Sequence, residues 1–329
     1  MIRILCWDQQ GNLEKDKSVE ACADILQAPE KTLWMDFCRS SPAASRAVFQ
    51  DIFKFHSLAI DDALEETHAP KIDDWEDYVC LVTQMIKAED KVESDLITQE
   101  VDIFIGRNYI ITYHPEESET VDKVWEAFQM GEGRHNHSPE NILYLLFDET
   151  ATDFMESISQ MELRLNALED QLFDNPSPSI QEDIFSLKRS ILQLQKSVGP
   201  QREVLNKLSR GDYPVIGNQS SMYFRDVYDH FSRLFEIIEN LRDLTGNVLE
   251  IYLSVVNNRM NGIMKTLTII TTLFMPISFL AGFFGMNFFA PIEHYVWWTS
   301  TPVLVTVILA SILFPAVMVF YFVKKGWMK

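Results

Sequence analysis

The 329-residue chain carries 48 acidic and 28 basic side chains and has a net charge of −20, which excludes a nucleic-acid binder that relies on phosphate neutralisation. The charge is unevenly spread. Residues 1–264 contain 47 acidic and 24 basic side chains, a net charge of −23, whereas residues 265–329 carry +3. The chain therefore consists of an acidic body and an apolar C-terminal part.

The first part of the body alternates strand-like and helix-like segments. Five segments rich in β-branched and aromatic residues predict strands, and a helical stretch, Ala43–Phe53, lies between two of them. The predicted strands are Ile2–Trp7, Thr32–Phe37, Tyr78–Met85, Ile97–Gly106 and Tyr109–Tyr113. This pattern predicts an α/β sheet domain.

Long helices follow. Apolar residues recur at helical spacing over Asn141–Leu172 and again over Ile180–Leu208, and a turn at Asp174–Ser179 separates the two stretches. A third helical pattern begins near Ser220 and shows no convincing stop before Gly285. A helix of that length measures roughly 100 Å, much more than the thickness of a membrane, so we expect it to project into the cytoplasm as a stalk.

Two apolar runs near the C-terminus predict transmembrane helices. No charged side chain occurs from Thr266 to Ile292 or from Tyr295 to Val323, and each run exceeds the ~20 residues that a membrane span needs. Basic residues flank only the inner ends, at Arg259, Lys265, Lys324, Lys325 and Lys329. This asymmetry predicts a hairpin in a bacterial-type inner or plasma membrane, with both termini on the cytoplasmic side. The first ten residues do not resemble a signal peptide, so we expect the body to stay cytoplasmic.

These elements predict six consecutive parts. They are a cytoplasmic α/β sheet domain (1–138), a cytoplasmic helical hairpin (139–219), a stalk helix that continues into the first transmembrane helix (220–287), an outer loop (288–297), a second transmembrane helix (298–323) and a basic tail (324–329).

One stripe of the first transmembrane helix is small or polar except for two methionines. Its members recur at alternating three- and four-residue steps and are Asn261, Met264, Thr268, Thr271, Met275, Ser278 and Gly282. In lipid such a stripe faces either another helix in a tight interface or a water-filled path. Two helices in each chain cannot enclose a pore, so the second interpretation also requires an oligomer.

The sequence at the outer end of this helix resembles the CorA family of divalent-cation channels. The segment Met275–Phe288 contains the Gly285-Met286-Asn287 triplet that is the signature of that family, and a short loop, a second span and a basic ending follow. Further resemblance lies in Tyr223–His230 and in Pro70-Lys71 followed by Tyr78.

The resemblance implies a funnel-shaped homopentamer in which the first transmembrane helix lines the pore. Asn287 would form a ring at the outer mouth that binds the water shell of Mg²⁺, an ion that loses water reluctantly. Gly285 would give the backbone the freedom to leave the helix, beside Met286. Met264, Leu267 and Met275 resemble the hydrophobic constriction of the family, which stops ions by dewetting, and Asn261 would add a polar ring at the inner end.

Eight carboxylates between Asp61 and Asp77 suggest regulation by a metal ion, although such a run is more commonly a solvated face. The resemblance places Asp62 near Asp226 of a neighbouring subunit as an intracellular Mg²⁺ sensor. Bound Mg²⁺ would hold the subunits closed, and its loss would let them separate. The expected ligands are therefore Mg²⁺ ions, both transported and regulatory, and no organic cofactor.

Other functions remain open at this stage. A zinc transporter of the same superfamily is one, although Met286 favours Mg²⁺, with Co²⁺ and Ni²⁺ also able to pass. A membrane-anchored metal-sensing scaffold without transport is another. An enzyme is disfavoured because the histidines form no HExxH motif, and neither a nucleophile elbow nor a phosphate loop is present. The four cysteines lack metal-site spacing and are expected to be reduced thiols.

Overall fold

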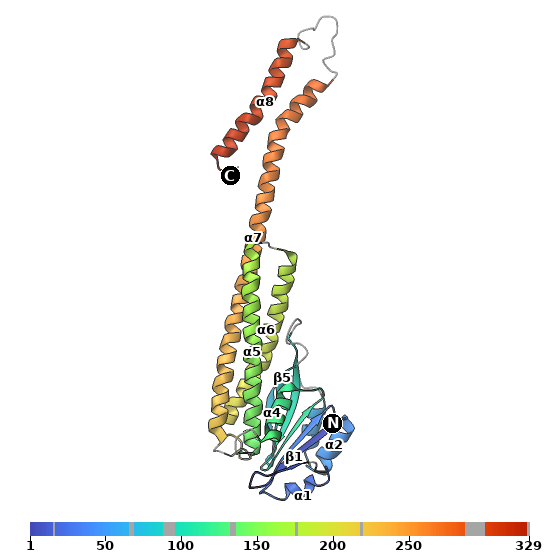
Figure 1. The fold of residues 1–329 in the computed structure, drawn as a ribbon. Helices are drawn as coiled ribbons and strands as arrows, with labels where there is room; N and C mark the ends of the chain where they lie inside the picture. Colours follow the sequence, from blue (N-terminus) through green and yellow to red (C-terminus); the bar gives the residue numbers. More distant parts are fainter. Residues whose placement is uncertain are drawn as a thin grey trace. The chain divides into compact units, whose positions relative to one another are not determined.

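The computed structural model describes residues 1–15, 17–65, 69–87, 96–131, 136–174, 177–217, 220–286 and 300–327. The chain forms two compact units, Met1–Glu250 and Ile251–Lys329, which we describe one at a time. Helix α7 (Ser221–Gly285) contributes residues to both units (Figure 1). The long helix predicted from Ser220 to Gly285 is confirmed, with its first residue one position later.

A seven-stranded mixed sheet forms the centre of the first unit. Its strand order is β2-β1-β3-β7-β6-β5-β4; β3 and β7 run parallel, and the other neighbouring strands run antiparallel. The strands are β1 (Ile2–Trp7), β2 (Leu13–Lys15), β3 (Thr32–Cys38), β4 (Lys71–Asp74), β5 (Val79–Ile86), β6 (Thr98–Ile105) and β7 (Tyr109–His114). The five predicted strands correspond to β1, β3, β5, β6 and β7, so the α/β class is confirmed.

The sequence interpretation missed the two edge strands, β2 and β4. Both are short, and their compositions, Leu-Glu-Lys and Lys-Ile-Asp-Asp, lack the β-branched and aromatic runs that indicate a strand. Charged residues are common on edge strands because they discourage pairing with another chain. The acidic stretch after Pro70 is therefore partly a strand at the sheet edge.

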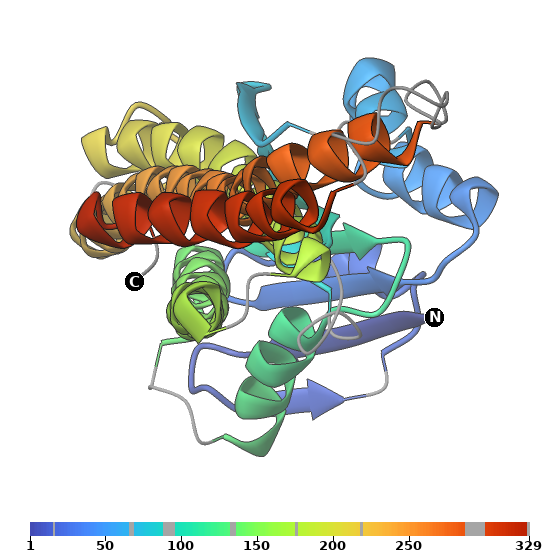
Figure 2. The same cartoon turned by 90° about the horizontal axis from the view of Figure 1, so that it is seen from above.

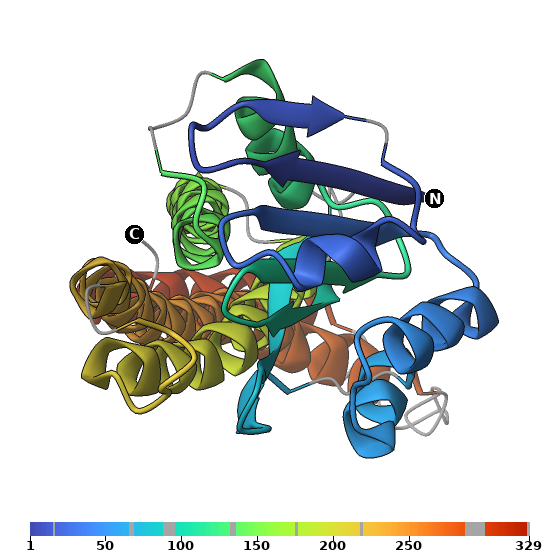
Figure 3. The ribbon, with the colours of Figure 1, turned by 90° about the horizontal axis from the view of Figure 1, so that it is seen from below.

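Helices cover both faces of the sheet. Three short helices, α1 (Cys22–Leu26), α2 (Pro42–Asp51) and α3 (Ser57–Leu64), pack on one face, where Phe49 contacts the rings of Phe37 (4.9 Å) and Phe104 (5.3 Å). Helix α4 (Glu119–Met130) packs on the other face through Trp125, whose ring lies 4.7 Å from that of Trp34. Figure 2 shows the green α4 in front of the strands, and Figure 3, from the opposite side, shows the blue α1 there.

The predicted helical hairpin is present as α5 (Pro139–Asp174) and α6 (Pro178–Arg210). The first part of α7 packs against this pair. Phe231 of α7 makes edge-to-face contacts with Phe147 and Phe154 of α5, at ring distances of 6.2 and 6.1 Å. An apolar seam of α7 is buried at Leu234, Ile238, Leu241 and Val248.

Hydrogen bonds between buried polar groups join the sheet to α6. The side chain of Gln201 accepts a hydrogen bond from the Thr83 hydroxyl (2.6 Å) and donates one to the main-chain oxygen of Gln84 (3.1 Å). The Ser197 hydroxyl donates to the side-chain oxygen of Gln84 (2.7 Å). Because all these groups are buried, they fix the position of α6 on β5.

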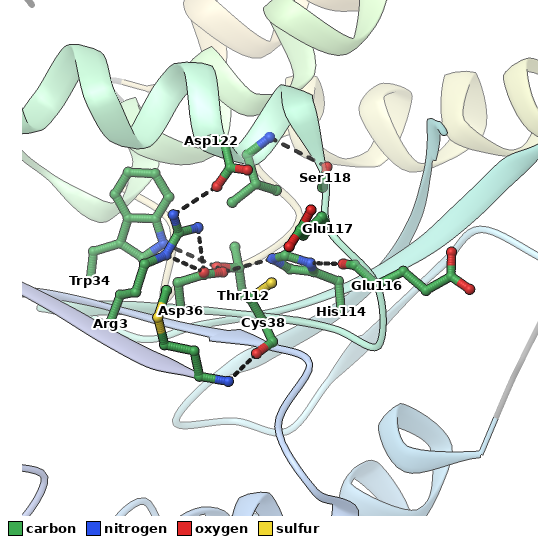
Figure 4. A network of polar contacts seen from close by, with 12 residues as sticks. Arg3, Trp34, Asp36, Cys38, Thr112, His114, Glu116, Glu117, Ser118 and Asp122 are labelled. Atoms are coloured by element: carbon green, nitrogen blue, oxygen red, sulfur yellow. Dashed lines mark hydrogen bonds and ion pairs between the residues drawn. The ribbon is translucent and has the colours of Figure 1, made fainter. Parts of the chain in front are cut away.

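A buried ion-pair network lies between the sheet and α4 (Figure 4). Asp36 on β3 is fully buried and accepts hydrogen bonds from Arg3 Nε (2.9 Å), Thr112 Oγ1 (2.5 Å) and His114 Nε2 (3.0 Å). The other ring nitrogen of His114 faces the main-chain oxygen of Glu116, so both nitrogens face acceptors and the surroundings favour the doubly protonated ring. Burial alone would lower the pKa of His114, but the hydrogen bond to Asp36 and its charge outweigh burial and raise that pKa.

The second unit contains the rest of α7 and helix α8 (Thr301–Lys324). Both helices are long and apolar enough to cross a membrane. The four cysteines, all in the first unit, are buried free thiols, as expected.

Candidate functional site

The stripe from Asn261 to Gly282 lies along the part of α7 that belongs to the second unit, and every one of its side chains is exposed. Exposure alone does not separate a path for water from a surface in contact with lipid. The position of the stripe relative to the less exposed residues of α7 helps to distinguish the two.

Only six residues between Asn257 and Met286, a stretch that the structure describes in full, are not exposed. They are Ile269, Thr272, Leu273, Pro276, Ile277 and Leu280. They lie on one face of α7. The less exposed residues of α8 also recur at three- and four-residue steps, as in Val303, Val307, Ala310 and Ser311, and Phe322 is buried. On each helix the less exposed residues therefore lie on one face, here called the sheltered face.

The sheltered face and the stripe point in different directions. Four of the sheltered residues come five positions after a stripe residue. The pairs, with the stripe residue first, are Met264 and Ile269, Thr268 and Leu273, Thr271 and Pro276, and Met275 and Leu280. Five residues turn an α-helix by roughly 140° beyond a full turn. Helix α8 of the same chain therefore does not cover the stripe. This excludes a tight interface between the stripe and α8 of the same chain.

The threonines of the stripe present hydrogen-bond acceptors. Thr268 Oγ1 donates to the main-chain oxygen of Met264 (2.7 Å), and Thr271 Oγ1 donates to that of Leu267 (2.9 Å). Each hydroxyl proton is thus used inside the helix, while the lone pairs of the oxygen stay available to water. Such a surface suits the hydration shell of a cation, whose waters donate outward.

Three apolar side chains interrupt this polar surface at the predicted constriction. Met264, Leu267 and Met275 are 53%, 56% and 65% exposed in the single chain. These side chains are therefore accessible for contact with the same residues of other subunits in an oligomer.

The predicted filter lies at the end of α7. Gly285 is the last helical residue and Met286 follows it, whereas Asn287 lies outside the described residues. Gly285 does not have a positive φ, and its predicted role of letting the backbone leave the helix stays a prediction. A Cβ at Gly285 would also meet nothing within 4 Å, so contacts within one chain do not require glycine there.

The two predicted sensor carboxylates belong to different elements of the first unit. Asp62 lies on α3 and is 45% exposed, and its carboxylate forms an ion pair with Lys71 of β4. Asp226 lies exposed on α7. The parts of the chain that the structure describes contain no group of three or more side chains placed to hold a metal ion. Carboxylate oxygens fit Mg²⁺, but its other ligands must come from water or from another chain.

Some of the eight carboxylates have cationic partners in the same chain. Asp61 pairs with Arg46 (2.7 Å), and Asp73 shares Lys71 with Asp62 at 3.2 Å. Glu66 lies outside the described residues. The acidic run from Asp61 to Asp77 is therefore partly neutralised by cations of the same chain, and its described residues do not form a complete metal site.

The whole chain was compared with known proteins. The family model described as CorA-like Mg²⁺ transporter protein matches residues 29–325. The chain belongs to the CorA family. YfjQ of Bacillus subtilis is 32% identical over 99% of this chain and 98% of its own sequence. The cobalt/magnesium transport protein CorA of Thermotoga maritima is 32% identical over 84% of this chain and 78% of its own.

A solved structure agrees with the fold. The CorA magnesium transporter of Methanocaldococcus jannaschii matches with a TM-score of 0.82 over 100% of this chain and 99% of that one, at 20% sequence identity. At that identity the likeness speaks for the fold alone. As a CorA protein, this chain is a divalent-cation transporter and not an enzyme, and its two C-terminal apolar helices cross the membrane.

The sequence interpretation of this CorA protein overlooked Lys71 as part of the site. Lys71 was noted only as part of the Pro70-Lys71 resemblance, yet it is the cation that contacts Asp62 and Asp73. Its position at the start of an edge strand, opposite an acidic helix, was not visible because that strand itself was missed.

Proposed function

We propose that this CorA protein is a Mg²⁺ channel that mediates Mg²⁺ influx as a homopentamer, with the stripe of α7 from each subunit facing a common axis. The observation that carries the proposal is the five-residue offset between the fully exposed stripe and the sheltered face of α7. A polar stripe that the second span leaves uncovered has either lipid or other subunits against it, and lipid is the costly alternative. The basic residues at the inner ends orient the body and both termini toward the cytoplasm.

Selection takes place at the outer mouth. Gly285, Met286 and Asn287 form the filter there, and the amide oxygens of an Asn287 ring accept hydrogen bonds from the waters of hydrated Mg²⁺. This arrangement avoids the large cost of removing those waters. One carboxylate, Glu293, is present in the outer loop. Electrostatic concentration of cations at the mouth is therefore modest.

The gate consists of Met264 and Met275 on the stripe and Leu267 beside it. Rings of Met264, Leu267 and Met275 narrow the path and expel water when the subunits are close. An ion cannot cross such a dry zone because it would have to give up its hydration shell. The polar positions Asn261, Thr268, Thr271, Ser278 and Gly282 keep the rest of the path hydrated.

Closure depends on intracellular Mg²⁺. Asp62 of one subunit and Asp226 of its neighbour bind the ion between them, which removes the repulsion of the two carboxylates and holds the subunits together. When internal Mg²⁺ falls, the ion leaves, the subunits separate and the apolar rings widen.

Ion flux into proteoliposomes tests the filter. Mg²⁺, Co²⁺, Ni²⁺ and Zn²⁺ are offered separately to the wild type and to Asn287→Ala, and we expect Mg²⁺ flux in the wild type and its loss in the variant. Equal flux in both proteins contradicts the filter, flux of Zn²⁺ alone identifies a zinc transporter, and absence of any flux favours a scaffold.

Cysteine modification tests which face of α7 lines the path. Thr271→Cys is compared with Ile270→Cys, its neighbour, since Ile270 is exposed in the chain but lies off the stripe. A charged thiol reagent is expected to block flux through the first variant and to leave the second unaffected. The four native cysteines are buried and provide a silent background. Block of both variants, or of Ile270→Cys alone, contradicts the proposed orientation.

A further inference from the structure

One carboxyl group in the sheet is buried with an unsatisfied oxygen. Asp102 on β6 is 2% exposed, and its Oδ1 is buried without a hydrogen-bond partner among the described residues. An ionised carboxylate is strongly disfavoured in such a place, so a buried carboxyl of this kind takes up a proton. Burial is the largest cause that raises the pKa of Asp102 well above its usual range, followed by the charge of Glu100.

Asp102 lies in the same cross-strand row as Lys71. Lys71 of β4 pairs with Val82 of β5, and Val82 pairs with Asp102 of β6. Residues directly opposite each other project from the same face of a sheet. Two strand spacings separate Lys71 from Asp102, about 10 Å between Cα atoms, and the four-carbon stem of a lysine allows its ammonium group to extend over the intervening valine.

Lys71 is paired with carboxylates other than Asp102. Its ammonium group contacts Asp62 of α3 and lies 3.2 Å from Asp73 of β4. Lys71 lowers the pKa of Asp102 and Asp62 raises it, so both charges are near enough for Asp102 to respond to them. A lysine between one ionised and one protonated carboxyl has two alternative partners.

The titratable groups around Asp102 come from every packed element. They are Glu100 on β6, Cys80 on β5, Lys71 and Asp73 on β4, Tyr113 on β7 and Asp62 on α3. Burial is the largest cause that raises the pKa values of Cys80 and Tyr113, and an ionised Asp102 would raise both further. Both groups are therefore neutral near pH 7, and Lys71 is the cation of this set.

We propose that Lys71 moves from Asp62 to Asp102 when Mg²⁺ binds at Asp62, and that Asp102 then releases its proton to the solvent. The inference rests on the proposed regulatory site. Before binding, Asp62 is an anion paired with Lys71 and Asp102 is a neutral acid. After binding, Asp62 is paired with Mg²⁺, Asp102 is an anion paired with Lys71, and one proton has left. Sensing of Mg²⁺ is thereby coupled to pH.

Calorimetric titration of the full-length protein in detergent tests the coupling. Mg²⁺ is added in two buffers that differ in ionisation enthalpy, and the difference in heat gives the protons released. We expect about one proton released for each Mg²⁺ bound in the wild type. The apparent Kd is expected to fall about tenfold for each unit by which pH rises, over the range in which Asp102 is protonated before binding and ionised after it.

Four variants give matched comparisons. Asp102→Asn keeps the neutral state of the acid and is expected to bind Mg²⁺ without releasing a proton or showing the pH dependence. Lys71→Met removes the moving cation and is expected to do the same. Asp77→Asn, an exposed acid of the same segment, is expected to behave as the wild type. Asp62→Asn is expected to lose the binding itself. An infrared band of a protonated carboxylic acid is expected to disappear on adding Mg²⁺ to the wild type and to be missing in Asp102→Asn.

The outcomes separate the two proposals. Undiminished Mg²⁺ binding by Asp62→Asn overturns the regulatory site. Binding that depends on Asp62 but releases no proton, or releases the same proton in Asp102→Asn, overturns the coupling and leaves the regulatory site in place.

Discussion

The buried network around Asp36 makes a strong prediction about stability. Asp36→Asn keeps the shape of the side chain and removes its charge. One carboxylate oxygen becomes an NH₂ group, so either Arg3 loses its acceptor and depends on Asp122 (2.7 Å), or His114 and Thr112 lose the oxygen that both now share. Two charge-assisted hydrogen bonds, at about 1.5–3 kcal/mol each, sum to about the 3–5 kcal/mol that removal of one partner of a buried ion pair costs. For a unit of 250 residues, this corresponds to a fall in Tm of roughly 6–20 °C.

The sign of the pH dependence follows from the same contacts. The pKa of His114 is raised in the folded state, so its contribution is complete below the unfolded value of about 6.5 and is lost as pH rises through the folded value. Burial acts to raise the pKa of Asp36, but the His114 hydrogen bond and the charges of His114 and Arg3 outweigh it and lower that pKa, so Asp36 stays ionised in this range. The difference between wild type and Asp36→Asn is therefore expected to shrink as pH rises.

Thermal unfolding measures both effects. Trp34 and Trp125 lie beside the network, so intrinsic fluorescence reports on its loss. The two proteins are compared from about pH 6 to about pH 9. A Tm difference that is negligible at the lower pH, or one that stays constant over the range, refutes the reasoning.

Three further predictions concern other parts of the chain. Gly106→Ala is expected to destabilise the first unit by about 1–3 kcal/mol, because the new Cβ would lie 2.2 Å from Cε1 of the Tyr109 ring; Gly131→Ala, where a Cβ meets nothing within 4 Å but φ is +71°, gives a comparison in which only backbone strain acts. Gln201→Leu leaves the Thr83 hydroxyl and the main-chain oxygen of Gln84 without their bonds to Gln201 and is expected to cost about 1–3 kcal/mol in chemical unfolding, whereas an unchanged midpoint contradicts the role of this contact. Met264→Ser is expected to raise Mg²⁺ flux at high internal Mg²⁺ by wetting the gate, while Ile263→Ser, exposed but off the stripe, is not; equal flux in the two variants contradicts the gate.

The parts of the fold that follow a regular pattern could be predicted from the sequence. The central strands have buried, β-branched stretches, and α7 combines an apolar seam with an uninterrupted helical period, so both were predicted within a residue or two. The edge strand β4 was not, because Lys71, Asp73 and Asp74 conceal the alternation.

The chemistry of the charged groups depended on that missed strand. Asp102 occupies a strand position that a sequence pattern assigns to a polar surface, and only the order β4-β5-β6 together with the covering α3 shows that it is buried. For the same reason the sequence predicted Asp62 as a sensor without its lysine partner. The predicted roles of Asn287 and of the stripe stay predictions, since the first lies outside the described residues and the second depends on neighbouring subunits.

The continuity of α7 also has a consequence for biosynthesis. All residues of the first unit precede Ile251, so the ribosome completes the sheet, the α5–α6 hairpin and the first part of α7 before either membrane-crossing segment is made. Domains fold as units during synthesis, from the N-terminus onward. The apolar end of α7 is therefore delivered to the membrane as the extension of a helix that the folded body already holds through Phe231 and Leu234.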